Sequence, residues 1–291
     1  MSITTEAMIA RLSISRWGGF ARDAEQSAVV AQTNHAQSDT ANVNKRLLPK
    51  TAMKDVNAAL NAVRTHFYET TLPWHDKGDR LLTRKMYMAF VERHEELRAK
   101  ANAEIDKFIF EIYPRELDRA EFRMGDLFDS SDYPAPRELR DKYAIRIEFD
   151  AVADANDFRV NMDQAHVDSI RANIEKNVQQ RVNDAMKDVW DRLASTLGHF
   201  HDRMVTTDAT FKRSTVDNLQ EIVDILPKLN LTDDPDLEAI RQDIQHHLSG
   251  LDPAELRKDT DQREAVAGEA KRIMSTMSGF MNATGGSENH G

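Results

Sequence analysis

Apolar residues recur at every third or fourth position over most of the chain, which is the spacing of an amphipathic helix. The longest such stretch, 164–205, contains no proline and one glycine, Gly198. It predicts a single helix about 60 Å long, more than the diameter of a small domain. Further helical patterns cover 213–229, 234–249 and 253–281. The second half of the chain is therefore expected to be a long helix with a helical bundle, and part of the long helix should pack against a partner helix.

A second group of helical patterns lies in the first half. One runs from Thr51 to about Phe67, and another from about Leu81 to Ile112. The segment LPWHDKGDR between them contains a proline and a glycine, so it should break the helix and form the turn of a helical hairpin. A shorter helix should follow the Tyr113-Pro114 interruption and end near Leu127.

Alternating apolar and polar residues predict three short strands at 11–17, 143–149 and 158–162. The last two are expected to form a β-hairpin with one apolar face. Because an isolated hairpin is marginally stable, the strand at 11–17 should pair beside it in a three-stranded antiparallel sheet. The polar stretch 32–46 has no periodicity and is expected to be a loop or the frayed end of a helix.

These elements predict an α+β fold that is predominantly α-helical. We expect an N-terminal domain over 1–163 with a helical hairpin and a small antiparallel sheet, then a helical region over 164–282 and a flexible tail over 283–291. The aromatic residues support a core in the first half, since 16 of the 20 lie before residue 160.

Composition removes several classes of function. The chain has no cysteine, which excludes disulfides, thiolate metal sites and a cysteine nucleophile. It contains no phosphate-binding glycine loop and no nucleophile elbow. No run of about 18 apolar residues and no leader pattern is present, so we expect a cytosolic protein without a membrane partner.

The net charge of −10 is uneven. Residues 1–150 contain 23 Lys and Arg against 24 Asp and Glu, whereas 151–291 contain 16 against 25. The acidic half disfavours duplex binding, but the nearly neutral first half leaves room for a local basic surface.

Histidine supplies the candidate metal ligands. Asp163 with His166 and Asp243 with His246 have helical i,i+3 spacing, and His199 lies close to His201 in the sequence. The paired Glu-x-x-His motif of a carboxylate-bridged site is absent, so we expect no metal, no cofactor and no catalytic residue.

The predicted sheet offers a possible surface for single-stranded nucleic acid. Its polar face would carry Arg146 and Arg159, with Arg16 and Trp17 nearby. Arginines hold a phosphate backbone and an aromatic ring stacks on a base. The alternative is that alternating Arg and Glu residues form solvated cross-strand pairs.

Three segments together resemble a family of uncharacterised tailed-bacteriophage proteins. They are LSISRWGG at 12–19, TLPWHDKGDRLL at 71–82, and LFDSSDYPAPRELRDKYAIRIEF followed by DFRV within 127–160. The resemblance implies a phage origin, a setting in the host cytoplasm, and genes of DNA metabolism or of an ATPase-linked remodelling system nearby. It implies no active site. The matching residues are expected to be architectural, namely Trp74, Gly78, Arg80, Tyr133, Pro134 and Asp157.

We therefore expect a non-enzymatic phage accessory protein that oligomerises through its helices, acts as a scaffold or adaptor, and contacts a phage or host protein. The main alternative is a protein that binds or anneals single-stranded DNA. A host-defence antagonist and a metal-dependent enzyme are further alternatives.

Overall fold

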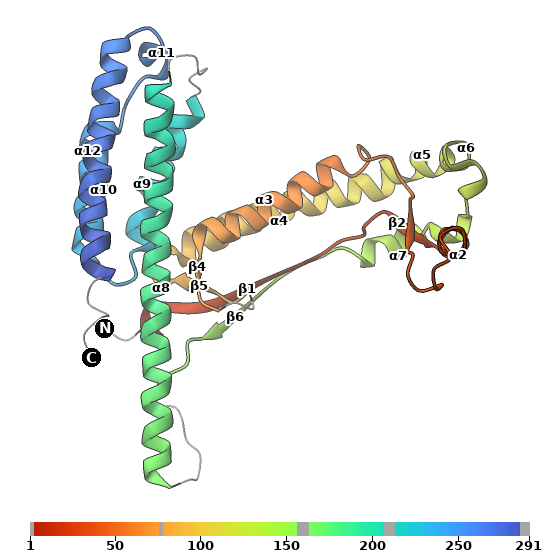
Figure 1. The fold of residues 1–291 in the computed structure, drawn as a ribbon, viewed down its shortest axis with the longest axis horizontal. Helices are drawn as coiled ribbons and strands as arrows, with labels where there is room; N and C mark the ends of the chain where they lie inside the picture. Colours follow the sequence, from red (N-terminus) through yellow and green to blue (C-terminus); the bar gives the residue numbers. More distant parts are fainter. Residues whose placement is uncertain (1–2, 76–77, 156–162, 207–212, 286–291) are drawn as a thin grey trace. The chain divides into compact units, whose positions relative to one another are not determined.

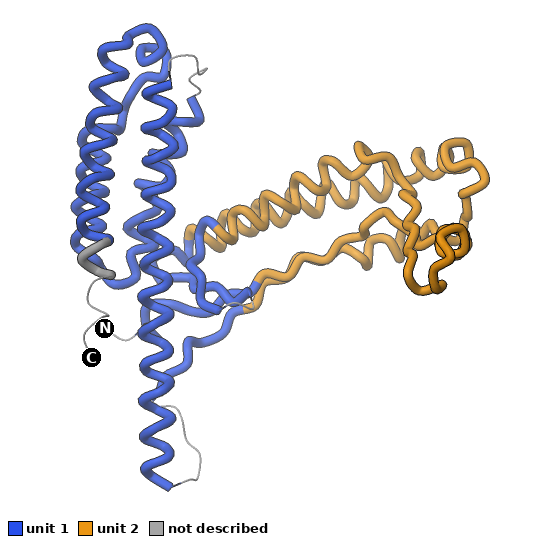
Figure 2. The backbone as a smooth tube through the Cα atoms, in the orientation of Figure 1, with its two compact units in different colours: residues 1–11, 69–88, 149–291 blue, residues 12–68, 89–148 orange. Residues whose placement is uncertain are grey.

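The computed structural model describes residues 3–75, 78–155, 163–206 and 213–285. The protein is a predominantly helical α+β structure, as the sequence pattern predicts (Figure 1). It divides into two compact units, which Figure 2 distinguishes by colour. Unit 1 comprises 1–11, 69–88 and 149–291, and unit 2 comprises 12–68 and 89–148. Each unit is assembled from separate segments, whereas the expected domains were continuous, with a boundary after residue 163.

Unit 1 contains the helical bundle. Its helices are α8 (Gln164–Val205), α9 (Arg213–Leu229), α10 (Pro235–Leu248), α11 (Pro253–Leu256) and α12 (Thr260–Gly285), close to the predicted ranges. The α10 and α11 helices each begin with a proline after an aspartate cap, because proline lacks the N–H that a first helical turn leaves unpaired. Helix α8 packs against α9 and α12, and α10 packs against both α9 and α12.

The apolar stripe of α8 is buried along only part of its length. From Val182 to Met204 the stripe residues are buried, and Leu193 and Leu197 are fully inaccessible. Nearer the N-terminus, Ile170, Ile174 and Val178 continue the stripe but are only half-buried, although Val167 before them is buried. Figure 1 shows the reason, since α9, α10 and α12 lie alongside the C-terminal part of α8.

A four-stranded sheet has the strand order β4-β5-β1-β6. The strands are β1 (Ala7–Ser15), β4 (Leu72–Pro73), β5 (Arg80–Thr83) and β6 (Ala144–Ala151). Strand β5 pairs antiparallel with both β1 and β4. The segment expected to be only a turn therefore contains a small β-hairpin, and the helix expected from Leu81 begins at Arg84. Leu81 and Leu82 are fully buried in the sheet, and this tertiary burial outweighs their helical spacing.

Strands β1 and β6, which correspond to two of the three strands predicted for one sheet, are adjacent in this sheet. Their residues alternate as expected, with Leu12 and Ile14 half-buried and Ser13 and Ser15 exposed. The expected third strand at 158–162 lies outside the described residues.

Two helices, α3 (Lys54–Thr70) and α4 (Arg84–Lys107), contribute to the core of unit 2. A few residues at the end of α3 and at the start of α4 belong to unit 1. Both helices correspond to the predicted hairpin helices. Short helices follow: α5 (Tyr113–Asp118), α6 (Ala120–Met124) and α7 (Pro136–Asp141), with 3₁₀ turns at Gly125–Leu127 and Ser130–Asp132. The buried residues of this core include Val63, Ala101, Ile105, Phe108 and Leu139.

A π-helical turn over Phe108–Ile112 joins α4 to α5. Pro114 supplies the physical reason, because it has no N–H to donate to the carbonyl four residues earlier and its ring would clash there. The N–H of Tyr113 instead donates to the carbonyl of Phe108, five residues back. The chain thus passes the proline without ending the helix.

The stretch around 32–46 is more ordered than the sequence suggested. The stretch begins with the last residues of helix α2 (Ala24–Thr33). It ends with strand β3 (Val43–Arg46), which pairs antiparallel with β2 (Phe20–Asp23). Asp23 caps α2 by accepting a hydrogen bond from the N–H of Gln26 at 2.9 Å. The expectation of an unstructured loop was wrong for 43–46, because pairing with a distant strand satisfies backbone groups that a local pattern does not predict.

The buried and the half-buried apolar residues of α8 should differ in their contribution to the free energy of unfolding. Leu193→Ala should lower the free energy of unfolding by about 2–5 kcal/mol, because the bundle cannot fill the space that the side chain leaves. Ile174→Ala should cost less than about 2 kcal/mol, since its side chain already meets solvent. Urea unfolding at low protein concentration measures both values, and equal losses would contradict the burial pattern.

Candidate functional site

The residues expected to bind nucleic acid do not form one open surface. Trp17 is only 8% exposed and meets the ring of Tyr113 edge-on, with centroids 5.7 Å apart. It belongs to the core of unit 2 and is not available to stack on a base. Arg16 is exposed and donates a hydrogen bond to Oδ1 of Asn57 at 2.5 Å.

Arg146 lies on β6 with its side chain exposed, as expected from the alternation along this strand. Arg159 lies outside the described residues. The surface proposed from the sequence therefore retains Arg16 and Arg146 but loses its aromatic component.

Three of the expected architectural residues lie in the β4–β5 hairpin. Trp74 is 5% exposed, and the guanidinium of Arg181 from α8 sits 5.5 Å from its ring centroid. Gly78 has φ +91°, a conformation that glycine adopts without strain, and forms the turn. The guanidinium of Arg80 donates to the side-chain oxygen of Thr71 at 3.0 Å and to its carbonyl at 2.6 Å.

Two others lie in unit 2. The Tyr133 hydroxyl donates to the carbonyl of Leu47 at 3.1 Å, and the Tyr113 hydroxyl donates to the carbonyl of Pro134 at 2.8 Å. Tyr133 thus holds the segment after β3, a contact that the sequence did not predict. Asp157 lies outside the described residues.

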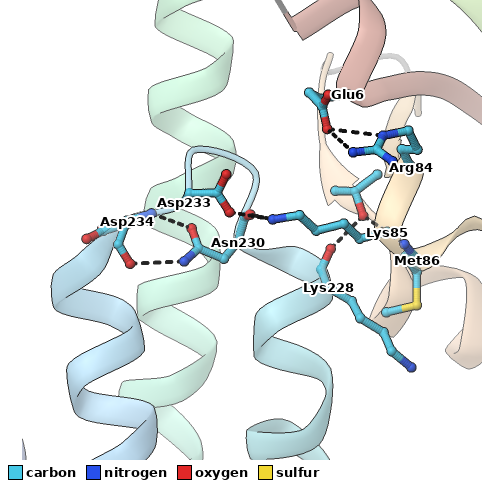
Figure 3. Close-up of polar contacts among 9 residues, drawn as sticks. Glu6, Arg84, Lys85, Met86, Lys228, Asn230, Asp233 and Asp234 are labelled. Atoms are coloured by element: carbon cyan, nitrogen blue, oxygen red, sulfur yellow. Dashed lines mark hydrogen bonds and ion pairs between the residues drawn. The ribbon is translucent and has the colours of Figure 1, made fainter. Parts of the chain in front are cut away.

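The structure reveals a polar junction in unit 1 that the sequence did not predict, centred on Thr83 (Figure 3). The Thr83 hydroxyl accepts a hydrogen bond from the N–H of Met86 at 3.2 Å, which caps the start of α4. The same hydroxyl donates to the carbonyl of Lys228 at 2.5 Å, near the end of α9. One buried oxygen therefore satisfies a free donor of one helix and a free acceptor of another.

The loop between α9 and α10 completes the junction. Asn230 accepts from the N–H of Asp234 at 2.8 Å and donates to its carbonyl at 3.0 Å. The Asp234 carboxylate caps α10 and also accepts from the indole N–H of Trp190 at 3.2 Å. Asp233, with φ +53°, forms an ion pair with Lys85, as Figure 3 shows.

Arg84 of the same junction binds Glu6, with Nη2 3.1 Å from the carboxylate. The Asp-Asp-Pro sequence at 233–235 predicts the start of α10, but no local pattern predicts that Thr83 belongs to the same junction. The junction holds helix ends together and presents no arrangement of nucleophile and base. Its role is structural.

Replacing Thr83 should destabilise unit 1. Thr83→Val keeps the shape of the side chain but leaves the Met86 N–H and the Lys228 carbonyl without this partner, at a cost of about 1–3 kcal/mol. Thr83→Ser keeps the hydroxyl and is the matched control. Urea unfolding should show a larger loss for valine than for serine, and the reverse order would refute the bridging role.

Unit 2 contains a buried histidine. His94 is 2% exposed, and neither of its ring nitrogens has a hydrogen-bond partner among the described residues. Its ring stacks on Phe90 at 5.3 Å, and Phe90 stacks on His66 at 5.4 Å. Burial is the main cause that lowers the pKa of His94; nearby Glu95 acts in the opposite direction, and His66 and Arg98 lower the pKa further.

This burial predicts a loss of stability in acid. The unfolded chain takes up a proton near the ordinary histidine pKa of 6.5, whereas the folded chain takes it up only at lower pH. The free energy of unfolding should therefore fall as the pH drops below about 6.5. His94→Leu should lose less stability between about pH 7 and pH 5 than the wild type, measured by urea unfolding. An equal loss in both proteins would contradict the role of His94.

Within the described part of the chain, no group of three or more His, Asp and Glu residues could hold a metal ion. Asp163 and His166 form an exposed pair at 3.3 Å on the first turn of α8. Asp243 is bound by Arg272 at 2.8 Å and lies 3.4 Å from His247. Among the candidate ligands, His166 thus pairs with Asp163 and His201 lies 3.3 Å from Asp202, whereas His247 and not the expected His246 meets Asp243.

The remaining candidate is the N-terminal part of α8. Ile170, Ile174 and Val178 lie on one side of the helix, whereas Ala172 and Gln179 on the opposite side are exposed. The half-buried residues continue the spacing that packs the bundle further along α8. This stripe, which we call the α8 stripe, is a surface on which another helix could pack.

Comparison with protein-family models, curated proteins and solved structures gave no match. No helix in the described ranges is long and apolar enough to span a lipid bilayer.

Proposed function

We propose that this protein is a non-enzymatic scaffold or adaptor that assembles with a second copy of itself through the α8 stripe. The observation that supports the proposal is the change in burial along one continuous helix. The stripe is half-buried at Ile170, Ile174 and Val178, whereas it is buried at Val167 and from Val182 onward.

Self-association would cover this surface without any change in the bundle. In this part of α8 the apolar positions 170, 174, 178 and 182 follow steps of four residues, so they lie within about 120° of one another around the helix. Two copies related by a twofold axis can therefore pack the same stripe against each other over several turns. A homodimer of this kind uses one surface on both subunits.

The setting we propose is a phage-infected host cell. It rests on the resemblance of 12–19, 71–82 and 127–160 to tailed-bacteriophage proteins. In that setting the assembled protein would serve phage DNA metabolism or an ATPase-linked remodelling system in the host cytoplasm.

Light scattering after size exclusion tests the assembly. The wild type should have a molar mass of at least twice 33.2 kDa at micromolar concentration. Ile174→Asp with Val178→Asp should give a monomer, because two carboxylates would be buried in the interface.

Ala172→Asp with Gln179→Asp is the matched control, since it adds the same charge to the exposed side of the same helix. It should keep the wild-type mass. A monomeric wild type, or an unchanged mass in the stripe variant, would refute assembly through α8.

A further inference from the structure

The outward face of the β2–β3 ribbon in unit 2 has an unusual composition. The ladder pairs Phe20 with Arg46 and Arg22 with Asn44. All four side chains are exposed, whereas the intervening residues of both strands are half-buried. This outward face, which we call the ribbon face, therefore contains one aromatic ring, two guanidinium groups and one amide, and no carboxylate.

Two acidic groups near the ribbon are engaged on its other side. Lys45 forms an ion pair with Asp132 at 2.6 Å, and Asp23 caps α2. Among the described residues, Arg22 and Arg46 form no ion pair with a carboxylate. Their positive charge is thus directed to solvent.

The arginines are spaced as a pair. Arg22 and Arg46 are diagonal neighbours across the ladder, a position in which the backbones of the two residues are about 7–8 Å apart. Arg123 adds a third guanidinium at the edge, since its Nη2 donates to the carbonyl of Arg46 at 3.2 Å. Such an array can contact successive phosphates of an extended strand.

Phe20 supplies a ring for stacking. It is 47% exposed, and the guanidinium of Arg46 lies over one face of the ring, 4.4 Å from its centroid, so a base would have to stack on the opposite face. Arginine and an exposed aromatic ring are the two components with which proteins hold a single-stranded backbone and stack a base.

We propose that the ribbon face binds single-stranded nucleic acid, with Arg22 and Arg46 on phosphates and a base stacked on Phe20. The site goes beyond the proposed assembly function and uses residues of the other unit. The charge of unit 2 permits it, because this unit contains 18 Lys and Arg against 19 Asp and Glu, so the excess of acid lies in unit 1. A single strand fits better than a duplex, whose bases are already stacked on one another.

Fluorescence anisotropy with two labelled probes tests the proposal. One probe is a 20-nucleotide oligothymidine, and the other is an abasic strand of the same length, which offers phosphates without bases. The full chain should bind oligothymidine about tenfold more tightly than the abasic strand, because stacking on one ring contributes an effect of about this size. Phe20→Ala should remove this preference.

Arg22→Gln with Arg46→Gln should weaken the binding of both probes and lower the slope of log affinity against log salt by about 1.4, since each phosphate contact on a single strand contributes about 0.7. Two exposed controls in unit 2 are matched to these changes. Phe110→Ala removes an aromatic ring that is 65% exposed, and Arg64→Gln with Lys142→Gln removes two positive charges. Both controls should bind as the wild type does.

Three outcomes would overturn the proposal. They are no binding of oligothymidine at low salt, equal affinity for the two probes, and tighter binding of a duplex of the same length. Equal affinity combined with a loss in the arginine variant would identify a general polyanion surface, which an acidic protein segment could also occupy. Thermal unfolding of each variant verifies that the fold is retained. Failure of this proposal can be distinguished from failure of the assembly proposal, because the assembly variants change only residues of α8.

Discussion

The end of helix α3 is held by two arginines, and this contact positions the elements of unit 1. The carbonyl of Thr71 accepts hydrogen bonds from Arg80 at 2.6 Å and from Arg192 of α8 at 2.8 Å. Arg192 also donates to the carbonyl of Glu69 at 2.9 Å and pairs with Asp188. The last carbonyls of a helix lack hydrogen-bond partners within the helix and have a partial negative charge. The two guanidinium groups supply hydrogen-bond donors and a positive charge there. Because Arg192 lies in the middle of α8, the long helix is fixed to the β4–β5 hairpin and to the end of α3 at once.

The same principle recurs at the other helix ends of unit 1. At the start of α4, Thr83 donates to the carbonyl of Lys228 in the last turn of α9, and Lys85 donates to the carbonyl of Asn230 directly after that helix. Such contacts join segments that are more than a hundred residues apart in the sequence. They explain why unit 1 is built from separate pieces of chain and why a boundary based on composition does not reproduce it. Apolar burial supplies most of the stability of the bundle, while these polar contacts select which segments meet.

The two surfaces proposed here belong to different units and have different chemistry. The α8 stripe is apolar and suits a second copy of the chain, whereas the ribbon face is basic and aromatic and suits a single strand. A protein with both could assemble through one unit and hold nucleic acid with the other. The acidic character of the whole chain does not oppose this arrangement, because the acid excess lies in the unit that contains α8.

The sequence alone determined the long helices of this protein, although it did not predict the short α2. The spacing of apolar residues predicted α8, α9 and α10 almost to the residue, because a long amphipathic helix has a strong periodic pattern and a proline marks where α10 begins. It also placed the strand at 11–17 in one sheet with the strand at 143–149. Tertiary structure alone decided the rest. Strands β3, β4 and β5 are too short for a clear alternation, and β3 and β5 pair with strands that are distant in sequence, so pairing rather than local propensity formed them. Burial removed Trp17 from the predicted binding surface and exposed Phe20 beside Arg46, since which side of an aromatic-rich segment faces the core depends on packing that no local pattern encodes.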